Sequence, residues 1–326
     1  MQQDAILPAV AKGGTGIGSA VTGSPSSQHK EEPEMIIRAS PLVTVLSCIA
    51  LALPVAASSQ NVDPWIAVGR TLGTENVSSA PYHRYNLPRS DLTLTIAGVD
   101  ASAIGLGAWV GFSGEPNDAT MMGDLVVTSA ELGPVLEELA RQRIAVTAIH
   151  NHFAGETPQI VYMHFHGQGV ATDLASRVER AVALTGTPRP APAPRPQPVQ
   201  IDTALVFRVL GQSGSASGPV ARLSFQLVDG AVTMDGRVVN PALGYGSPIV
   251  IQQVNANRAV ATGDFAVRGR AVTPLLRALA EGGTVATAVH SHLIDSDPDI
   301  TYIHFWGDGP LNDVLRGLRS ALDAGR

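Results

Sequence analysis

The chain has 326 residues, of which 44% are hydrophobic and 15% charged, and a formal net charge of −6. This length and composition allow a sizeable core in one large or two ordinary domains and exclude global disorder. The mild acidity, with no basic stripe, argues against nucleic acid as a partner. No lysine follows Lys30, which excludes Schiff-base chemistry and a phosphate-binding P-loop.

Two segments are predicted to precede the first domain. Residues 1–34 are rich in Gly, Ser and Gln, and we interpret them as a disordered or wrongly assigned upstream extension. Residues 35–57 begin with a basic stretch, continue with an apolar run too short to span a bilayer comfortably, and end with small residues, as a secretory signal peptide does. We therefore expect a secreted or periplasmic protein with no membrane span after cleavage. A buried helix or a membrane anchor is the alternative.

Cys48 is the only cysteine of the chain. Its surroundings resemble a lipobox faintly, but the apolar run continues well beyond it, which favours a signal peptide over a lipoprotein anchor. After cleavage no cysteine remains, so disulfides, thiolate metal ligands and a cysteine nucleophile are excluded.

The rest of the chain is an internal duplication. An offset of 140 residues, as from His150 to His290, aligns the two copies without a gap through their most similar stretch. Between the copies, six prolines alternate with other residues, a pattern that favours an extended polyproline linker. We predict a first repeat domain over 61–186, a linker over 187–200 and a second repeat domain over 201–326.

Each repeat is predicted to be an α+β unit. A capping box from Thr128 to Glu131 precedes apolar residues at helical spacing. Strands are expected at 92–96, 107–112, 125–127, 144–152 and 160–166, followed by a helix near 173–184. These elements indicate a mainly antiparallel sheet with helices on one face, and the two tandem units are expected to pack as a pseudo-dimer.

Histidines cluster in both repeats. Seven of the nine in the chain lie in two short segments, namely His150, His152, His164, His166, His290, His292 and His304. Residues two apart on a strand point to the same face, so His150 and His152 should project together, and an antiparallel neighbour could bring His164 within reach. Three converging imidazoles with one open position are typical of sites for zinc, copper, nickel or iron.

Glu156 accompanies the first triad and is predicted to be a fourth ligand or a general base. The second copy has Ser296 at the matching place, and Trp306 in place of His166. The first repeat is therefore the favoured site. Histidines that only hydrogen-bond each other or the backbone, with no metal, are the alternative.

Two further residue pairs recur in both copies. Asp124 and Asp264, each after a glycine, could hydrogen-bond the histidines, although a turn or edge aspartate is the favoured interpretation. Tyr162 and Tyr302 share the predicted face of the third histidine in each copy. They could bind a ligand or be structural.

Residues 146–152, followed by Glu156, Pro158 and residues 162–165, form one motif, and residues 122–131 form another. Both are similar to the LppY/LpqO family of exported bacterial proteins, over both halves of the chain. The resemblance implies signal-bearing proteins with this domain in tandem and carries no established activity. Gln159 and Asp299 depart from it, because an arginine is expected after the proline.

Two function classes stay open. Serine-hydrolase and nucleotide-binding motifs are lacking, so we expect no nucleotide cofactor. The first hypothesis is a protein that binds a divalent metal, zinc or copper, and uses it for hydrolysis. The second is a non-catalytic envelope module that binds an unknown small molecule or glycan and has structural histidines.

Overall fold

The computed structural model describes residues 62–78, 80–192 and 199–326. The predicted upstream extension and signal peptide, with part of the proline-rich linker, lie outside these residues. Everything described belongs to one compact unit, Ser59–Arg326.

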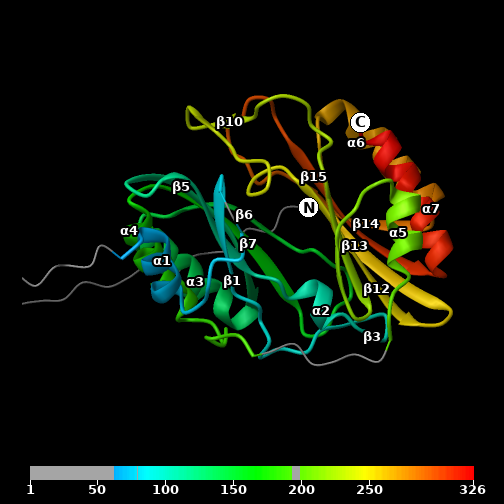
Figure 1. Ribbon diagram of the computed structural model, residues 1–326, viewed down its shortest axis with the longest axis horizontal. Helices are drawn as coiled ribbons and strands as arrows, with labels where there is room; N and C mark the ends of the chain where they lie inside the picture. The colour runs from blue at the N-terminus through cyan, green and yellow to red at the C-terminus, as the bar shows by residue number, and fades with distance from the viewer. Residues whose placement is uncertain (1–61, 79, 193–198) are drawn as a thin grey trace, which may run out of the picture. The chain divides into compact units, whose positions relative to one another are not determined.

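The first half is an antiparallel sheet with helices on one face (Figure 1). Its elements are α1 (Pro64–Leu72), β1 (Tyr82–Asn86), β2 (Thr95–Ile96), β3 (Val99–Asp100), α2 (Ser102–Gly105), β4 (Trp109–Glu115), β5 (Asp118–Thr128), α3 (Ser129–Arg141), β6 (Ala145–His150), β7 (Ile160–Gly169) and α4 (Ala171–Val182). Five strands pair in the order β1-β4-β5-β7-β6, while β2 and β3 form a separate ribbon.

The second half repeats this arrangement. Its elements are α5 (Thr203–Leu210), β8 (Ser215–Ser217), β9 (Val220–Phe225), β10 (Thr233–Met234), β11 (Arg237–Val238), β12 (Ser247–Asn255), β13 (Arg258–Val267), α6 (Gly269–Glu281), β14 (Thr284–His290), β15 (Thr301–Gly309) and α7 (Leu311–Ala324). The strand order is β14-β15-β13-β12-β9-β8. Apart from the edge strand β8 it matches the first sheet, which confirms the predicted tandem α+β architecture.

Helices α1, α3 and α4 of the first half and α5, α6 and α7 of the second lie on the outer side of each sheet, and the two sheets face each other (Figure 1). The short helix α2 instead lies between the halves, against β12. Each half has its own core between sheet and helices. A third apolar cluster joins the inner faces: Met122 of the first half packs there with Leu243, Leu293 and Tyr302 of the second. The predicted pseudo-dimer is thus present within one chain.

Hydrogen bonds also connect the halves close to the histidines. The Thr287 hydroxyl donates to the His152 carbonyl at 2.6 Å, and the Asn151 side chain donates to the Thr287 carbonyl at 3.1 Å. On β12, the Gln252 side chain donates to the Asp100 carbonyl at 2.9 Å. The two bonds of Thr287 fix where the end of β6 lies relative to β14, and the bond of Gln252 joins the halves at β3 and β12.

The predicted strand over 144–152 is too long. Strand β6 ends at His150, and His152 lies in the bend that follows; β14 likewise ends at His290. The Asn151 side chain ends the ladder, because it donates to the Phe153 carbonyl at 2.8 Å as well as to the other half. The prediction over 92–96 was also too long, since only Thr95–Ile96 is strand.

A buried ion-pair network stabilises the start of α3. The Arg89 side chain is 1% exposed and donates to Asp91 at 2.8 and 2.9 Å and to Glu131 at 2.8 and 3.0 Å. Glu131 also accepts from the backbone N–H and the hydroxyl of Thr128, at 2.8 and 2.9 Å, which confirms the capping box. The second copy has Ala271 at the matching place, so the network belongs to the first half.

Replacing Glu131 by Gln should lower the free energy of unfolding by about 3 kcal/mol, because a buried guanidinium loses one of its two charge partners. Urea denaturation followed by circular dichroism measures the loss. In the control Asp313→Asn, which breaks an exposed pair with Arg316, the change should stay within about 0.5 kcal/mol. Equal losses in the two variants would contradict the assignment.

Candidate metal centre

Six histidines meet between the two sheets, three from each half. The rings of His150 and His290, at the ends of β6 and β14, stack with centroids 3.9 Å apart. Two further pairs of rings stack across the halves. His152 stacks on His304 and His164 stacks on His292, each with centroids 3.6 Å apart. Each stacked pair joins the two halves, so the cluster has the approximate twofold symmetry of the duplicated chain.

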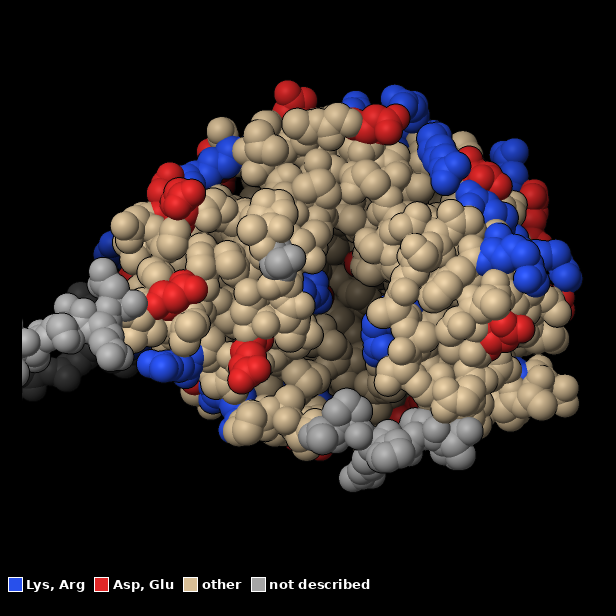
Figure 2. Space-filling model, in the orientation of Figure 1, with Lys and Arg blue, Asp and Glu red and all other residues tan. Residues whose placement is uncertain are grey.

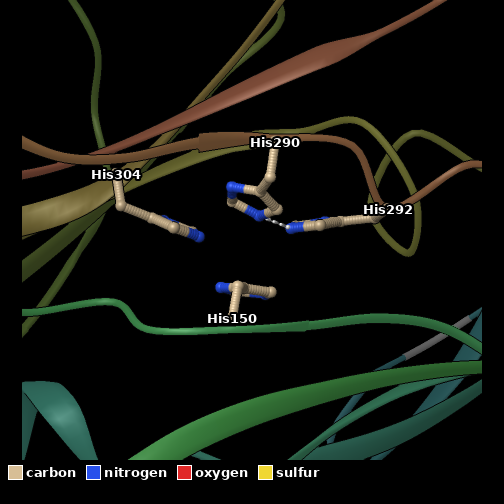
Figure 3. Close-up of side chains that lie close together, drawn as sticks. All are labelled: His150, His290, His292 and His304. Carbon is tan, nitrogen blue, oxygen red and sulfur yellow. Dashed lines mark hydrogen bonds between the residues drawn. The ribbon is translucent and has the colours of Figure 1, made fainter. Parts of the chain in front are cut away.

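Four of these residues form one close group (Figure 3). One ring nitrogen from each of His150, His290, His292 and His304 lies within 4.8 Å of the others. His304 also belongs to a second such group, with His152 and Asp264. Both groups combine residues of the two halves, whereas the sequence analysis expected one triad per half and favoured the first. Within the described ranges, neither group could form from one repeat alone.

Several buried ring nitrogens of the six histidines have no hydrogen-bond partner among the described residues. They are Nε2 of His150, His152, His164 and His304, and Nδ1 of His290; Nε2 of His166, outside the cluster, is unpaired as well. His290 and His292 share one contact, Nε2 to Nε2 at 2.6 Å, drawn dashed in Figure 3. Unpaired buried polar atoms are uncommon in proteins because each costs free energy. Those of His150, His152, His290 and His304 belong to the two close groups, which makes these groups candidate ligand sites, whereas His164 belongs to neither and its Nε2 lies 3.5 Å from Oδ2 of Asp124.

In two of the four grouped rings, Nε2 is unpaired and the other ring nitrogen, Nδ1, lies close to a protein oxygen. His150 Nδ1 lies 3.2 Å from the Asn151 carbonyl. His304 Nδ1 lies 2.5 Å from Oδ1 of Asp264 and 3.3 Å from the Gly263 carbonyl. Histidines that bind a metal typically have this arrangement, with one nitrogen on a protein oxygen and the other free to coordinate.

Asp124 and Asp264 are the carboxylates nearest the rings, as cross-strand partners of His164 and His304. They lie in the interior strands β5 and β13, so the favoured interpretation of turn or edge residues was wrong. Burial raises the pKa of Asp124 well above its usual value, the negative charge of Asp264 raises it further, and Arg84 opposes the shift. The signal in the sequence was the Gly-Asp pair retained in both copies. Glycine is needed before Asp124, because a Cβ there would lie 2.1 Å from the ring of Phe165.

The predicted general base lies outside both groups. Glu156 is half-buried, and its negative charge contributes to raising the pKa of Tyr162, chiefly a burial effect. Its catalytic role stays a prediction. The hydroxyls of Tyr162 and Tyr302 donate to the carbonyls of Gly105 and Gly244, at 2.5 Å each, so they hold neighbouring loops in place.

His166 is also outside the groups. Its Nδ1 lies 3.5 Å from Oδ2 of Asp235, at the contact between the halves. At the equivalent place Trp306 packs edge-on against Phe153, with centroids 5.9 Å apart. Both positions therefore serve the packing between the halves.

Burial favours the neutral form of five rings, those of His150, His152, His164, His290 and His292. Desolvation, followed by the repulsion of a neighbouring ring charge, lowers the pKa of His150 to about 4 and that of His290 to about 2. The same causes hold the pKa of His152, His164 and His292 well below its usual value. A neutral imidazole has a lone pair available for a metal.

A cavity of about 500 Å³ reaches the cluster from the solvent. His164 and His292 line it together with Asp124 and Asp264, so its wall comes from both halves. Figure 2 shows the molecular face hollowed between the halves, with basic side chains on both sides of the hollow.

The chain belongs to the family described as Domain of Unknown Function (DUF1259), whose model matches twice, at residues 66–184 and 204–324. The two matches agree with the two halves of the fold. This family match does not name the LppY/LpqO family, which stays a prediction. No curated protein matches the sequence.

Two solved structures are weakly similar. One is a fused permuted hexameric shell protein from the RMM microcompartment, with 14% identity, a TM-score of 0.18, and coverage of 64% of this chain and 85% of that one. The other is EtuB from Clostridium kluyveri, with 14% identity, a TM-score of 0.20, and coverage of 77% of this chain and 90% of that one. Likeness at this level supports no conclusion. Within the part of the chain described, no helix is long and apolar enough to cross a membrane.

The metal-free protein should lose stability on acidification. The pKa of His150 is about 4 in the folded chain and about 6.5 in an unfolded one. The unfolded chain therefore binds a proton first as the pH falls below about 6.5, and the folded state is destabilised until about pH 4. His150 alone should contribute roughly 3 kcal/mol over this interval, at about 1.4 kcal/mol per pKa unit.

Urea unfolding of the metal-free chain at several pH values between 7.5 and 4 measures this loss. The variant His150→Gln should show a shallower decline than the unsubstituted protein does. A stability that is flat across the interval would contradict the burial of neutral rings.

Proposed function

We propose that this chain binds a divalent metal ion, zinc or copper, between its two repeats, through His150, His290, His292 and His304. The observation that supports this is the pair of free Nε2 atoms on His150 and His304, each on a ring whose other nitrogen meets a protein oxygen. Four imidazole nitrogens suit tetrahedral zinc, and imidazole also suits copper. The described residues contain no cysteine that could compete as a ligand.

The proposed reaction is hydrolysis of a ligand in the adjoining cavity. A divalent metal at this place would supply a Lewis acid and, by accepting a fifth ligand beside the four imidazoles, could lower the pKa of a bound water. Asp124 lines the same cavity, and burial raises its pKa well above the usual value of a carboxyl group, which favours the protonated form. It is thus placed to give or accept a proton. Glu156, the base expected from the sequence, is the weaker candidate because it lies outside the grouped ligands.

The proposal also places the protein outside the cytoplasm. It rests here on the signal-like sequence of residues 35–57. Sequencing the N-terminus of the exported protein tests it: a first residue close to Ser58 supports the cleavage, and an intact residue 35 would contradict it.

Elemental analysis of protein purified without a histidine tag tests the metal. We expect about one zinc or copper per chain, and a higher melting temperature after metal is added, because a ligand that binds only the folded state stabilises it. His150→Ala should weaken metal binding by about tenfold or more. The control is His166→Gln, since this histidine belongs to the same sequence segment but lies outside the groups.

A preparation without metal, whose melting temperature is unchanged by added zinc and copper, would overturn the proposal. The histidines would then be structural, and the second hypothesis, a non-catalytic module that binds a small molecule or glycan, would replace it.

A second experiment tests whether both halves contribute. His290→Ala and His304→Ala should weaken metal binding as much as His150→Ala does, because the four rings form one group. Competition with a metal chelator of known affinity measures each loss. If the two second-half variants keep the affinity of the unsubstituted chain, the metal lies in the first repeat, as the sequence alone had indicated.

A further inference from the structure

Two arginines hold equivalent places in the two sheets. In the register of the first sheet, Arg84 on β1 pairs with Gly111 on β4, which pairs with Met122 on β5. In the second sheet, Arg222 on β9 pairs with Val250 on β12, which pairs with Thr262 on β13. Met122 and Thr262 correspond in the duplication. The arginines are therefore related by the same approximate symmetry as the histidines.

Both arginines line the cavity that reaches the histidine cluster. The same wall includes His164, His292 and Asp124. Its volume of about 500 Å³ is in the range of sites for small organic molecules. A molecule of that size could contact an arginine and the rings at the same time.

Neither guanidinium is in an ion pair with any carboxylate of the described residues. Arg84 donates from Nε to Asn86 at 3.2 Å and lies over the Trp109 ring, 4.2 Å from its centre. Arg222 donates from Nη2 to the Ala103 carbonyl at 2.8 Å, across the contact between the halves. A guanidinium has five N–H donors, so most of them stay available on each side chain.

The charges of the cavity favour an anion. Burial lowers the pKa of Arg84 to about 10, yet this side chain stays charged at neutral pH. A divalent metal at the histidines would add two positive charges. Asp124 and Asp264 are the acidic residues that line the cavity and could offset these positive charges. The raised pKa of Asp124 favours its neutral form.

We propose that this cavity binds a small molecule with a carboxylate or phosphate group, held by Arg84 and Arg222, with the rest of the molecule against the histidine cluster. Arginine is suited to both groups, because its planar fork pairs with two oxygens at once. The inference rests on the proposed function, because the part of the ligand that is not held by the arginines would contact the proposed metal. It adds the substrate class: small anions.

Isothermal titration calorimetry tests the inference, with inorganic phosphate and acetate as separate probes. Each probe is titrated into the full chain in its zinc-loaded and its metal-free form. We expect at least one probe to bind, and the tighter one identifies the anionic group. Arg222→Gln and Arg84→Gln should each weaken binding by about tenfold or more. Arg316→Gln, exposed on α7, should leave it unchanged.

Circular dichroism and metal content are measured on the same samples. If Arg84→Gln fails to fold, Arg222→Gln decides, because this side chain is exposed at the cavity and its loss leaves no hole in the core. The inference is overturned if neither probe binds in either form. It is also overturned if the folded arginine variants bind as tightly as the unsubstituted chain, since the metal alone would then hold the anion.

These outcomes separate the two proposals. A zinc-loaded chain that binds no anion overturns the present inference and keeps the metal. A chain that binds no metal, but binds phosphate in a way that depends on the arginines, overturns the proposed function and keeps the anion site.

Discussion

Imidazole rings buried between two sheets impose the constraint on which the centre of this molecule depends. Each neutral ring has one donor and one acceptor, and leaving either without a partner in a dry environment costs free energy. The protein satisfies part of this requirement itself, through the carbonyls of Asn151 and Gly263. Of the nitrogens that remain unpaired, those of His150, His152, His290 and His304 belong to the two close groups. A cation shared among them would satisfy several at once, which is the physical basis of the proposed metal site.

The duplicated fold places the rings in this position. Each sheet is covered by helices on one face only, so the other face must be buried, and the second copy buries it. The short strands β6 and β14 end at the contact, where side chains of Asn151 and Thr287 bind the opposite half. The same packing encloses the cavity and sets one arginine of each sheet on its wall. Centre and cavity are therefore both products of one interface.

The sequence was sufficient for the fold class and for the identity of the clustered histidines. Capping-box chemistry and alternation are local, so α3 and most strands were predicted from neighbouring residues. The grouping of the rings was missed, because His150 and His304 are brought together by sheet packing, which leaves no trace in residue spacing. Arg84 and Arg222 were missed for a related reason. They are offset by 138 residues, whereas the aspartates are offset by 140, so small length changes between the copies hide the equivalence.

The single covalent chain has a consequence for how the centre can vary. Two separate copies of one repeat, paired about a true twofold axis, would have to contribute identical side chains. Fusion removes that restriction, and the two repeats differ at equivalent positions. Trp306 of the second repeat corresponds to His166 of the first, and Ser296 corresponds to Glu156. Only the first half has the Arg89 network. One side of the centre can therefore change to suit a bound molecule while the other preserves the packing. A dimer of identical subunits cannot separate these two demands.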